Sequence, residues 1–245
     1  MQDHKCLNCG TPLGGKYCSG CGQKSDTHRL TLKHFLTHEL LHGVWHLEKG
    51  IILTVKAALM RPGYAALDYI AGKRVKYYNV FYLMLLVLAA IIFTINHSSG
   101  TESFDKELIE DPDEIAEKFI TAIKYYIKPL LFTLVPLLAI NSFILYRKLK
   151  LNFLEHIIVS GFTVLGMFIV ALLSAILSIK YYPVTDSISS VLGWVVLLFP
   201  ALSQYQVSKS KYTLFGFGWR LIISFIMFVI EIFIILFLFG VYVIS

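Results

Sequence analysis

The sequence predicts an all-α membrane protein that crosses the bilayer about five times and carries a small metal-binding module at its N-terminus. Three observations support this fold class. Hydrophobic residues make up 56% of the 245 residues and charged residues only 16%, with a mean hydropathy of +0.67, which is too apolar for a soluble domain of this length. Five stretches reach the length of about 20 apolar residues that a spanning helix needs. Four cysteines lie together near the start.

The first element is the cysteine-rich segment CLNCGTPLGGKYCSGCG. It contains two Cys-x-x-Cys pairs, and each pair is followed by a glycine, which permits a sharp turn. Two such turns can close a tetrahedral site of four thiolates, for which zinc is the usual ion. The predicted ligands are Cys6, Cys9, Cys18 and Cys21. Because so short a segment buries little core, the ion would supply most of its folding free energy, on the order of 10 kcal/mol or more.

An iron-sulfur cluster and a redox dithiol pair are the alternatives for these cysteines. A thioredoxin-like motif needs a framework of strands and helices, which the surrounding sequence does not predict. All four cysteines of the chain lie between residues 6 and 21, a usage typical of metal binding in a reducing cytoplasm. No apolar signal peptide precedes them. We therefore expect the N-terminal module to remain in the cytoplasm.

Residues 26–76 connect the predicted zinc ribbon, residues 1–25, to the first span and have the periodicity of interfacial helices. An aliphatic stripe lies opposite a ladder of histidines at four-residue steps, namely His34, His38, His42 and His46. Two imidazoles one turn apart can share a metal ion or take part in proton transfer. The alternative is a set of amphipathic rings at the membrane interface. Further short helices are predicted at 51–60 and, after Pro62 and Gly63, up to residue 70.

The segment GKRVKYY leads directly into the first span. Lys73, Arg74 and Lys76 are expected at the level of the lipid phosphates. Tyr77 and Tyr78 follow as a predicted aromatic belt. The three basic residues are candidates for contacts to lipid phosphate or to a partner, although anchoring of the membrane orientation alone also explains them.

The predicted transmembrane domain covers residues 77–245. Its five spans are expected at about 78–96, 127–146, 156–179, 188–207 and 219–243. Residues 1–76 hold eleven Lys and Arg against five acids, whereas the first connection, 97–128, holds eight acids against four lysines. The positive-inside rule therefore places the N-terminus in the cytoplasm and the C-terminus outside. The acidic connection is predicted to form an amphipathic helix on the outer surface or, alternatively, a solvated loop.

Glu231 is the only carboxylate predicted near the middle of a span. An ionised acid there costs roughly 3 kcal/mol or more, so it should face protein or water or remain protonated. Asn141 on the second span lies at a similar predicted depth and is the expected partner. Three roles stay open: a proton or cation site of a transporter, a neutral structural carboxyl, and a contact with another subunit. Glu155 and His156, at the start of the third span, are expected to cap and anchor it at the interface.

Several of these segments together resemble a known but uncharacterised family. The four-cysteine ribbon, LTVKAALMRPG and YIAGKRVKYY, followed by several spans, are similar to bacterial inner-membrane proteins known only as a domain of unknown function. The resemblance covers residues 6 to about 84. It implies a fold and a compartment, the bacterial inner membrane, and no activity. Family members tend to carry a proline after the last tyrosines, where this chain has Asn79 and Val80.

The sequence predicts an accessory or scaffold subunit of an inner-membrane complex rather than an enzyme. It contains no nucleophile elbow, phosphate-binding glycine loop or metalloprotease motif. Residues 1–76 carry a net charge of +6, eleven basic minus five acidic residues, which suits the docking of a partner. Expected partners are membrane lipids and other membrane subunits, with RNA or a ribosome as a minor alternative. No small-molecule substrate is identified, and the competing prediction is a transporter or lipid-handling protein that uses Glu231.

Overall fold

The computed structural model describes residues 5–27, 50–97, 114–180 and 185–244 of the chain. These residues form seven α-helices and one short 3₁₀ helix, and the only β-structure within them is two isolated bridges. The elements, in chain order, are α3 (Ile51–Met60), α4 (Pro62–Ile70), α5 (Val80–His97), α7 (Glu114–Leu145), η3 (Arg147–Leu149), α8 (Phe153–Lys180), α9 (Thr185–Ser208) and α10 (Leu214–Ile244). The all-helical prediction is confirmed for this part of the chain.

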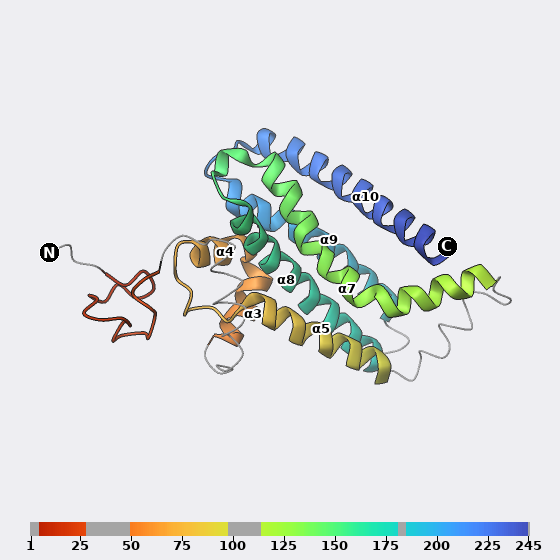
Figure 1. The fold of residues 1–245 in the computed structure, drawn as a ribbon, viewed down its shortest axis with the longest axis horizontal. Helices are drawn as coiled ribbons and strands as arrows, with labels where there is room; N and C mark the ends of the chain where they lie inside the picture. Colours follow the sequence, from red (N-terminus) through yellow and green to blue (C-terminus); the bar gives the residue numbers. More distant parts are fainter. Residues whose placement is uncertain (1–4, 28–49, 98–113, 181–184, 245) are drawn as a thin grey trace.

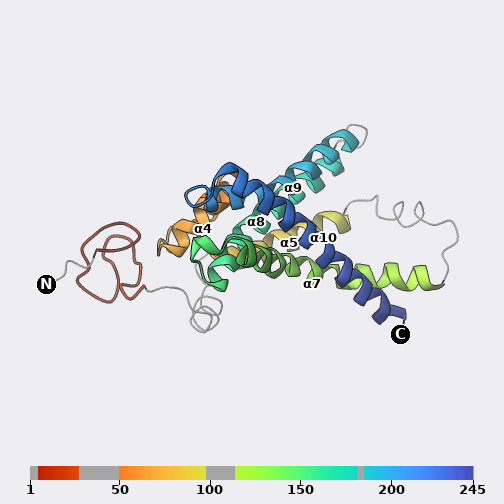
Figure 2. The same cartoon turned by 90° about the horizontal axis from the view of Figure 1, so that it is seen from above.

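The long helices α5, α7, α8, α9 and α10 run alternately between the same two ends of a bundle (Figure 1). One end carries the connections α4–α5, α7–α8 and α9–α10, and the cysteine module, residues 5–27, lies beyond this end (Figures 1 and 2). The last turn of α10 lies at the opposite end. Lysines and arginines concentrate in the three connections, at residues 73–76, 147–150 and 209–211. We therefore name this end of the bundle the basic end.

Three helices are long and apolar enough to cross a membrane: Phe153–Leu177 in α8, Val191–Ser208 in α9 and Leu214–Tyr242 in α10. The chain is therefore a membrane protein. The apolar parts of the other two long helices, Val80–Ile95 and Leu131–Leu145, are shorter. Helices thus occupy all five predicted ranges, and three of them have the full length of a span.

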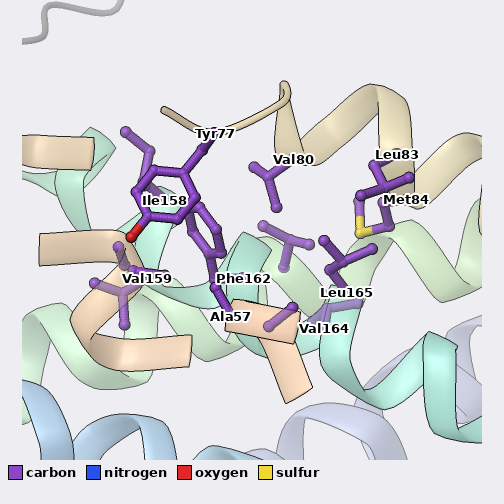
Figure 3. Close-up of a cluster of buried hydrophobic side chains, with 14 of the residues drawn as sticks. Ala57, Tyr77, Val80, Leu83, Met84, Ile158, Val159, Phe162, Val164 and Leu165 are labelled. Atoms are coloured by element: carbon purple, nitrogen blue, oxygen red, sulfur yellow. The ribbon is translucent and has the colours of Figure 1, made fainter. Parts of the chain in front are cut away.

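α8 lies at the centre of the bundle and packs against α3, α4, α5, α7 and α9. About two thirds of its apolar stretch is buried, whereas none of the corresponding stretch of α10 is. Ile158, Phe162 and Leu165 project from α8 into the core, where Leu83 and Met84 of α5 lie close to Leu165 (Figure 3). Both helices are apolar on all sides, and such a helix is stable either inside a core, as α8 is, or against lipid, as the position of α10 allows.

The two short helices α3 and α4 begin and end where the sequence predicts, on either side of Arg61. They also contribute to the core, because Ala57, Ala58, Ala65 and Ala66 are buried and both helices pack against α8. Small side chains allow helices to approach one another closely. Hydropathy alone does not indicate this packing, since an alanine contributes little to the apolar signal of a segment.

Two glycines mark the closest helix contacts. A side chain at Gly63 of α4 would collide with the backbone carbonyl of Ser203 in α9. A side chain at Gly166 of α8 would lie 2.6 Å from the carbonyl of Ala58 in α3 and would collide with the Phe199 ring of α9. At these two points the helices are in contact through their backbones, so the residue there must be glycine for the observed packing.

The two tyrosines before α5 are core residues, so the predicted aromatic belt is wrong. Tyr77 and Tyr78 are both buried. The Tyr77 ring packs edge-to-face on Phe162, with the ring centroids 5.7 Å apart (Figure 3). The backbone N–H of Tyr78 donates to the hydroxyl of Thr54 in α3 at 2.8 Å. α3 therefore fixes the chain at the entry to α5 and turns both rings inward.

Asn79 starts α5 by capping its N-terminus. Its Oδ1 accepts hydrogen bonds from the N–H groups of Phe81 at 3.0 Å and Tyr82 at 3.4 Å. Asparagine is among the best residues for this position, because its side chain replaces a missing helical hydrogen bond. The residue that departs from the family pattern therefore provides a regular helix start.

α7 joins two elements that the sequence predicts separately. It runs without interruption from Glu114 to Leu145, through part of the predicted outer amphipathic helix and the second span. The helix changes direction along its length (Figure 1). Residues 98–113 of the acidic connection lie outside the described residues, so the prediction for the outer surface stays a prediction.

Candidate metal centre

The cysteine module is built from two turns of the same form, one at Cys6 and one at Cys18. In the first turn, the N–H of Cys6 donates to the Thr11 carbonyl and the N–H of Gly10 donates to the Cys6 carbonyl, both at 2.9 Å. Gly10 has a φ of +78°, a conformation that glycine adopts without strain. This is the sharp turn that the glycine after the first cysteine pair predicts.

The second turn repeats these bonds. The N–H of Cys18 donates to the Gln23 carbonyl and the N–H of Gly22 donates to the Cys18 carbonyl, both at 2.8 Å. Gly22 has a φ of +75°. Each turn is closed by an isolated antiparallel bridge, between Lys5 and Pro12 and between Tyr17 and Lys24. The two halves of the module therefore present their cysteines in equivalent ways.

The sulfurs of Cys6, Cys9, Cys18 and Cys21 all lie within 4.8 Å of one another. Two pairs across the turns are closer, at 3.6 Å between Cys6 and Cys21 and 3.5 Å between Cys9 and Cys18. A disulfide needs about 2.05 Å between sulfurs, so all four are free thiols. Four sulfurs placed tetrahedrally around an ion, with bonds of about 2.3 Å, lie roughly 3.8 Å apart. The cluster therefore can hold one metal ion.

The protonation of these thiols also favours a cation. Hydrogen bonds to Thr11 lower the pKa of the Cys9 thiol to about 6. A hydrogen bond from the Gln23 backbone lowers the pKa of Cys21, but burial and the neighbouring Cys9 and Cys6 outweigh it and raise that pKa to about 11. Negative charge on one sulfur thus opposes charge on the next. A bound cation removes this conflict and allows four thiolates to coexist.

The module is seated on the turn between α4 and α5. Gln23, which is only 4% exposed, donates from Nε2 to the Gly72 carbonyl at 2.8 Å and accepts from the Val75 N–H at 3.5 Å. The first cysteine turn reaches the same glycine, because a Cβ at Gly72 would lie 2.7 Å from Cδ1 of Leu7. Gly72 has a φ of +100°, so both its conformation and its lack of a side chain serve this contact. Both halves of the module therefore depend on one turn of the bundle.

Asp68 of α4 organises the same turn. Its carboxylate accepts hydrogen bonds from Lys73 at 2.7 Å, Lys76 at 3.1 Å and the Tyr77 hydroxyl at 2.9 Å. Burial raises the pKa of Asp68, but these donors outweigh it and lower the pKa to about 2. Two of the three basic residues predicted to contact lipid phosphate or a partner thus also bind an acid of the protein itself. Arg74, the third, lies in the same turn.

Sequence reasoning missed Gln23 and Asp68. A signal existed for Asp68, because it is the one acid between Gly50 and Lys76, a segment that is otherwise basic and apolar. No local signal existed for Gln23, since its side chain bonds to residues 49 and 52 positions further along the chain. Contacts of this range depend on how the module and the bundle meet.

The structure brings together the predicted intramembrane pair. Nδ2 of Asn141 in α7 donates to Oε2 of Glu231 in α10 at 3.0 Å. Asn141 is completely buried, and its Oδ1 has no hydrogen-bond partner within the described part of the chain. The pair thus contains one satisfied bond and one unsatisfied buried acceptor.

α10 is attached to α7 at three levels. At the basic end, Nε of Arg220 donates to the Leu145 carbonyl, the last of α7, at 3.0 Å. The amide–carboxyl pair lies between the ends. Further along α10, the Tyr126 ring packs edge-to-face on Phe239, with centroids 5.7 Å apart. Most of the other large side chains of α10 are apolar and exposed, as lipid contact requires.

The start of α8 is capped as the sequence predicts. Oε2 of Glu155 accepts from the Asn152 N–H at 2.8 Å, and Oδ1 of Asn152 accepts from the Glu155 N–H at 2.9 Å, which is a capping box. The predicted anchoring of His156 at the interface is wrong, because this ring is 2% exposed and lies 2.7 Å from the Ser142 hydroxyl of α7. The ring therefore lies between α8 and α7 and not at the membrane interface.

The predicted histidine ladder, His34, His38, His42 and His46, lies outside the described residues. Within the residues that are described, the four cysteines are the one group of three or more metal-ligating side chains close enough to hold an ion. The second metal or proton site that the ladder suggests stays a prediction.

A family model described as a protein of unknown function (DUF3667) matches residues 48–93. The match spans α3, α4, most of α5 and the turn on which the cysteine module is seated. It supports the resemblance to an uncharacterised family, and no activity comes with it. No curated protein and no solved structure matches the chain.

Proposed function

We propose that this protein is an accessory or scaffold subunit of an inner-membrane complex, in which a zinc-loaded cysteine module docks a partner at the cytoplasmic face. The observation that carries this proposal is the contact between the cysteine module and the α4–α5 turn. Both cysteine turns contact the α4–α5 turn, one through Leu7 and the other through Gln23. A partner held by the module is thereby held in a fixed position relative to the bundle. The proposed role is structural and not enzymatic.

Zinc is the proposed ion because the donor set consists of four cysteine sulfurs. A closed site of four thiolates leaves no position for water, which suits a structural zinc rather than a catalytic one. The closest sulfurs are 3.5 to 3.6 Å apart, a spacing that suits one ion better than the larger core of an iron-sulfur cluster. Cys6, Cys9, Cys18 and Cys21 would hold the ion, and it would stabilise a module that has little core of its own.

The proposed topology has five passes, with residues 1–25 as the zinc ribbon, 26–76 as the cytoplasmic region and 77–245 as the transmembrane domain. The alternating directions of the long helices and the basic residues at one end support it (Figure 1). By the positive-inside rule, the basic end faces the cytoplasm and the end of α10 faces outward. The shorter apolar parts of α5 and α7 can be accommodated by local thinning of the bilayer. The bacterial inner membrane is proposed from the family resemblance.

The surface proposed for docking consists of the outward side of the module and the basic end. Tyr17 is 65% exposed and offers apolar contact, while the lysines of the connections favour an acidic surface. Another membrane protein subunit fits this combination. Anionic lipids are the proposed neighbours of Lys73, Arg74 and Lys76. RNA or a ribosome is a minor alternative, because Tyr17 is the one aromatic residue in the described part of the module.

Purification of the tagged full-length protein in mild detergent tests the docking role. We expect specific membrane subunits to co-purify with the wild type, to be lost from Cys18→Ser, and to be retained by Ser19→Ala, an exposed neighbour of that cysteine. Loss from the first variant alone assigns docking to the folded module. A zinc-loaded protein that purifies alone and monomeric would contradict the proposal.

A second candidate function is transport or lipid handling through Glu231. The hydrogen bond between Asn141 and Glu231 favours it, because this places a paired carboxyl between α7 and α10 within an apolar segment. Two variants separate the candidates. Glu231→Gln should abolish a transport function and leave co-purification intact, whereas Cys18→Ser should have the reverse effect.

A further inference from the structure

We propose that Glu231 carries a proton in the membrane and forms a cyclic acid–amide pair with Asn141, so that the two side chains make up an intramembrane proton-binding site. The proposal goes beyond the docking role and does not depend on it. It rests on the partner of the carboxyl, on its surroundings and on the unsatisfied oxygen of the amide.

The observed partner of Glu231 is neutral. Nδ2 of Asn141 donates to Oε2 at 3.0 Å, and an amide group contributes no positive charge. The carboxylate of Asp68, by contrast, pairs with the ammonium groups of Lys73 and Lys76. An ionised Glu231 would therefore be a charge in the middle of an apolar segment, bonded only to a neutral amide.

No cation lies on Leu131–Leu145 of α7 or on Val191–Ser208 of α9, the apolar stretches beside Glu231. α10 packs against α7 and, to a smaller extent, α9. Leu131–Leu145 of α7 contains no titratable residue, and Val191–Ser208 of α9 contains only Tyr205. The one basic residue of α10 is Arg220, whose guanidinium binds backbone carbonyls at the basic end. The apolar surroundings thus strongly disfavour the ionised form of the carboxyl.

The buried oxygen of the amide requires a donor. Oδ1 of Asn141 has no partner among the residues described, although the side chain is 0% exposed. An ionised carboxylate only accepts hydrogen bonds, whereas a protonated carboxyl also donates one. An acid and a primary amide can then form a ring of two hydrogen bonds, N–H to the acid carbonyl and O–H to the amide carbonyl. The first of these bonds is observed, and a proton on Oε1 of Glu231 supplies the second.

A protonated carboxyl in a bilayer has a characteristic reactivity that serves as a probe. Dicyclohexylcarbodiimide is apolar and dissolves in the hydrocarbon. One of its nitrogens takes the carboxyl proton while the carboxylate oxygen adds to its central carbon, and the adduct rearranges to a stable acylurea without another reactant. Glu231 is partly exposed on α10. Glu155 is the control, because its carboxylate accepts the Asn152 N–H at the N-terminus of α8 and has no amide partner of the kind that Asn141 offers Glu231.

The test is to treat the full-length protein in phospholipid vesicles with this reagent and to locate the adduct by peptide mass spectrometry. We expect modification of Glu231 and not of Glu155. Between about pH 6 and pH 8 the labelling rate should change less than about two-fold, whereas that of a glutamate with an ordinary pKa of about 4.3 falls about 100-fold. An unmodified Glu231, or a rate that falls about tenfold per pH unit, would overturn the proposal. Protection by sodium ions would overturn it too, because it would show a carboxylate that binds a metal cation.

Variants of the amide test the pairing itself. Asn141→Leu leaves the acid in place but removes the oxygen that holds its proton, so the labelling of Glu231 should persist and become several-fold faster. Asn141→Ala serves the same purpose if the larger side chain prevents assembly. An unchanged rate in a folded variant would show that the amide does not bind the acid. Glu231→Gln should lose this adduct and keep its contact with Asn141, because an amide can still accept from Nδ2.

Discussion

The side-chain amide of Gln23 donates a hydrogen bond of 2.8 Å to the backbone carbonyl of Gly72, 49 residues further along the chain. Gln23 also belongs to the metal centre, because its own carbonyl accepts the N–H of Cys18 at 2.8 Å. From Gly72 the chain continues through a short turn to Tyr77, whose ring packs on Phe162 in the core of the bundle. Gln23 therefore joins the metal centre to a turn that is anchored in the membrane domain.

Gln23→Ala should weaken the attachment of the module to the bundle without removing its metal ligands. Loss of a buried hydrogen bond costs about 1–3 kcal/mol, so amide hydrogen exchange at residues 71–75 should accelerate about 10- to 100-fold. Mass spectrometry of the full-length protein measures this exchange. Ser25→Ala is the control, since it removes an exposed bond of 3.0 Å within the module, and it should leave residues 71–75 unchanged. Equal exchange in wild type and Gln23→Ala would show that the seat does not depend on this side chain.

Gly166→Ala should destabilise the bundle where α3, α8 and α9 meet. The added methyl would lie 2.6 Å from the Ala58 carbonyl. Overpacking of this kind typically lowers the free energy of unfolding by about 1–3 kcal/mol. Gly193→Ala in α9 is a matched control, because no atom lies within 4 Å of a Cβ there. Thermal unfolding in detergent should show a lower midpoint for the first variant and an equal or higher midpoint for the second. Equal midpoints for both variants would contradict the close helix contact.

The sequence is sufficient to predict the features that depend on neighbouring residues. The helices break on either side of Arg61 because a proline and a glycine follow it, and the metal ligands are recognisable because Cys6 and Cys9 repeat as a second pair. The inward direction of Tyr78 is not predictable in this way, since it depends on a hydrogen bond to Thr54 in another helix.

The depth of a polar residue is easier to predict than its neighbours. Asn141 and Glu231 could be paired because Asn141 is the polar residue nearest to Glu231 in predicted depth, and they meet at 3.0 Å. His156 lies at the start of α8, and its position in the sequence therefore favours the interface. Its burial follows from the direction in which α7 crosses α8, which the sequence does not contain.

Asn79→Ala should destabilise the protein by about 1 kcal/mol, because it removes the side chain that caps α5. Asn79→Ser should restore most of this loss, since a serine hydroxyl accepts from the same N–H groups. Both effects can be measured as shifts of the thermal midpoint in detergent. If the two variants were equally destabilised, the loss of side-chain volume at position 79, and not the loss of the helix cap, would be the cause of the lower stability.

Asp68 should make the stability of the protein depend on pH in acid. Its pKa is about 2 in the folded protein against an ordinary value of 3.8. Because the folded value is the lower one, the carboxylate stabilises the fold above about pH 4, and this contribution is lost as the pH falls through about 2. Asp68→Asn should therefore be less stable than wild type at neutral pH and equal to it near pH 2. Thermal unfolding over a pH series tests this, and a difference that persisted at the acidic end would contradict it.

The metal ion and the seat of the module are tested together by hydrogen exchange of the full-length protein, loaded with zinc and then stripped by a chelator. We predict that chelation accelerates exchange in the cysteine turns, residues 6–23, and also at residues 71–75, where Gln23 and Leu7 meet the bundle. Residues 158–165 in the centre of α8 should be unchanged and serve as the internal reference. Identical exchange in both forms, or an opened module with an unchanged turn at 71–75, would contradict a metal-dependent module seated on the membrane domain.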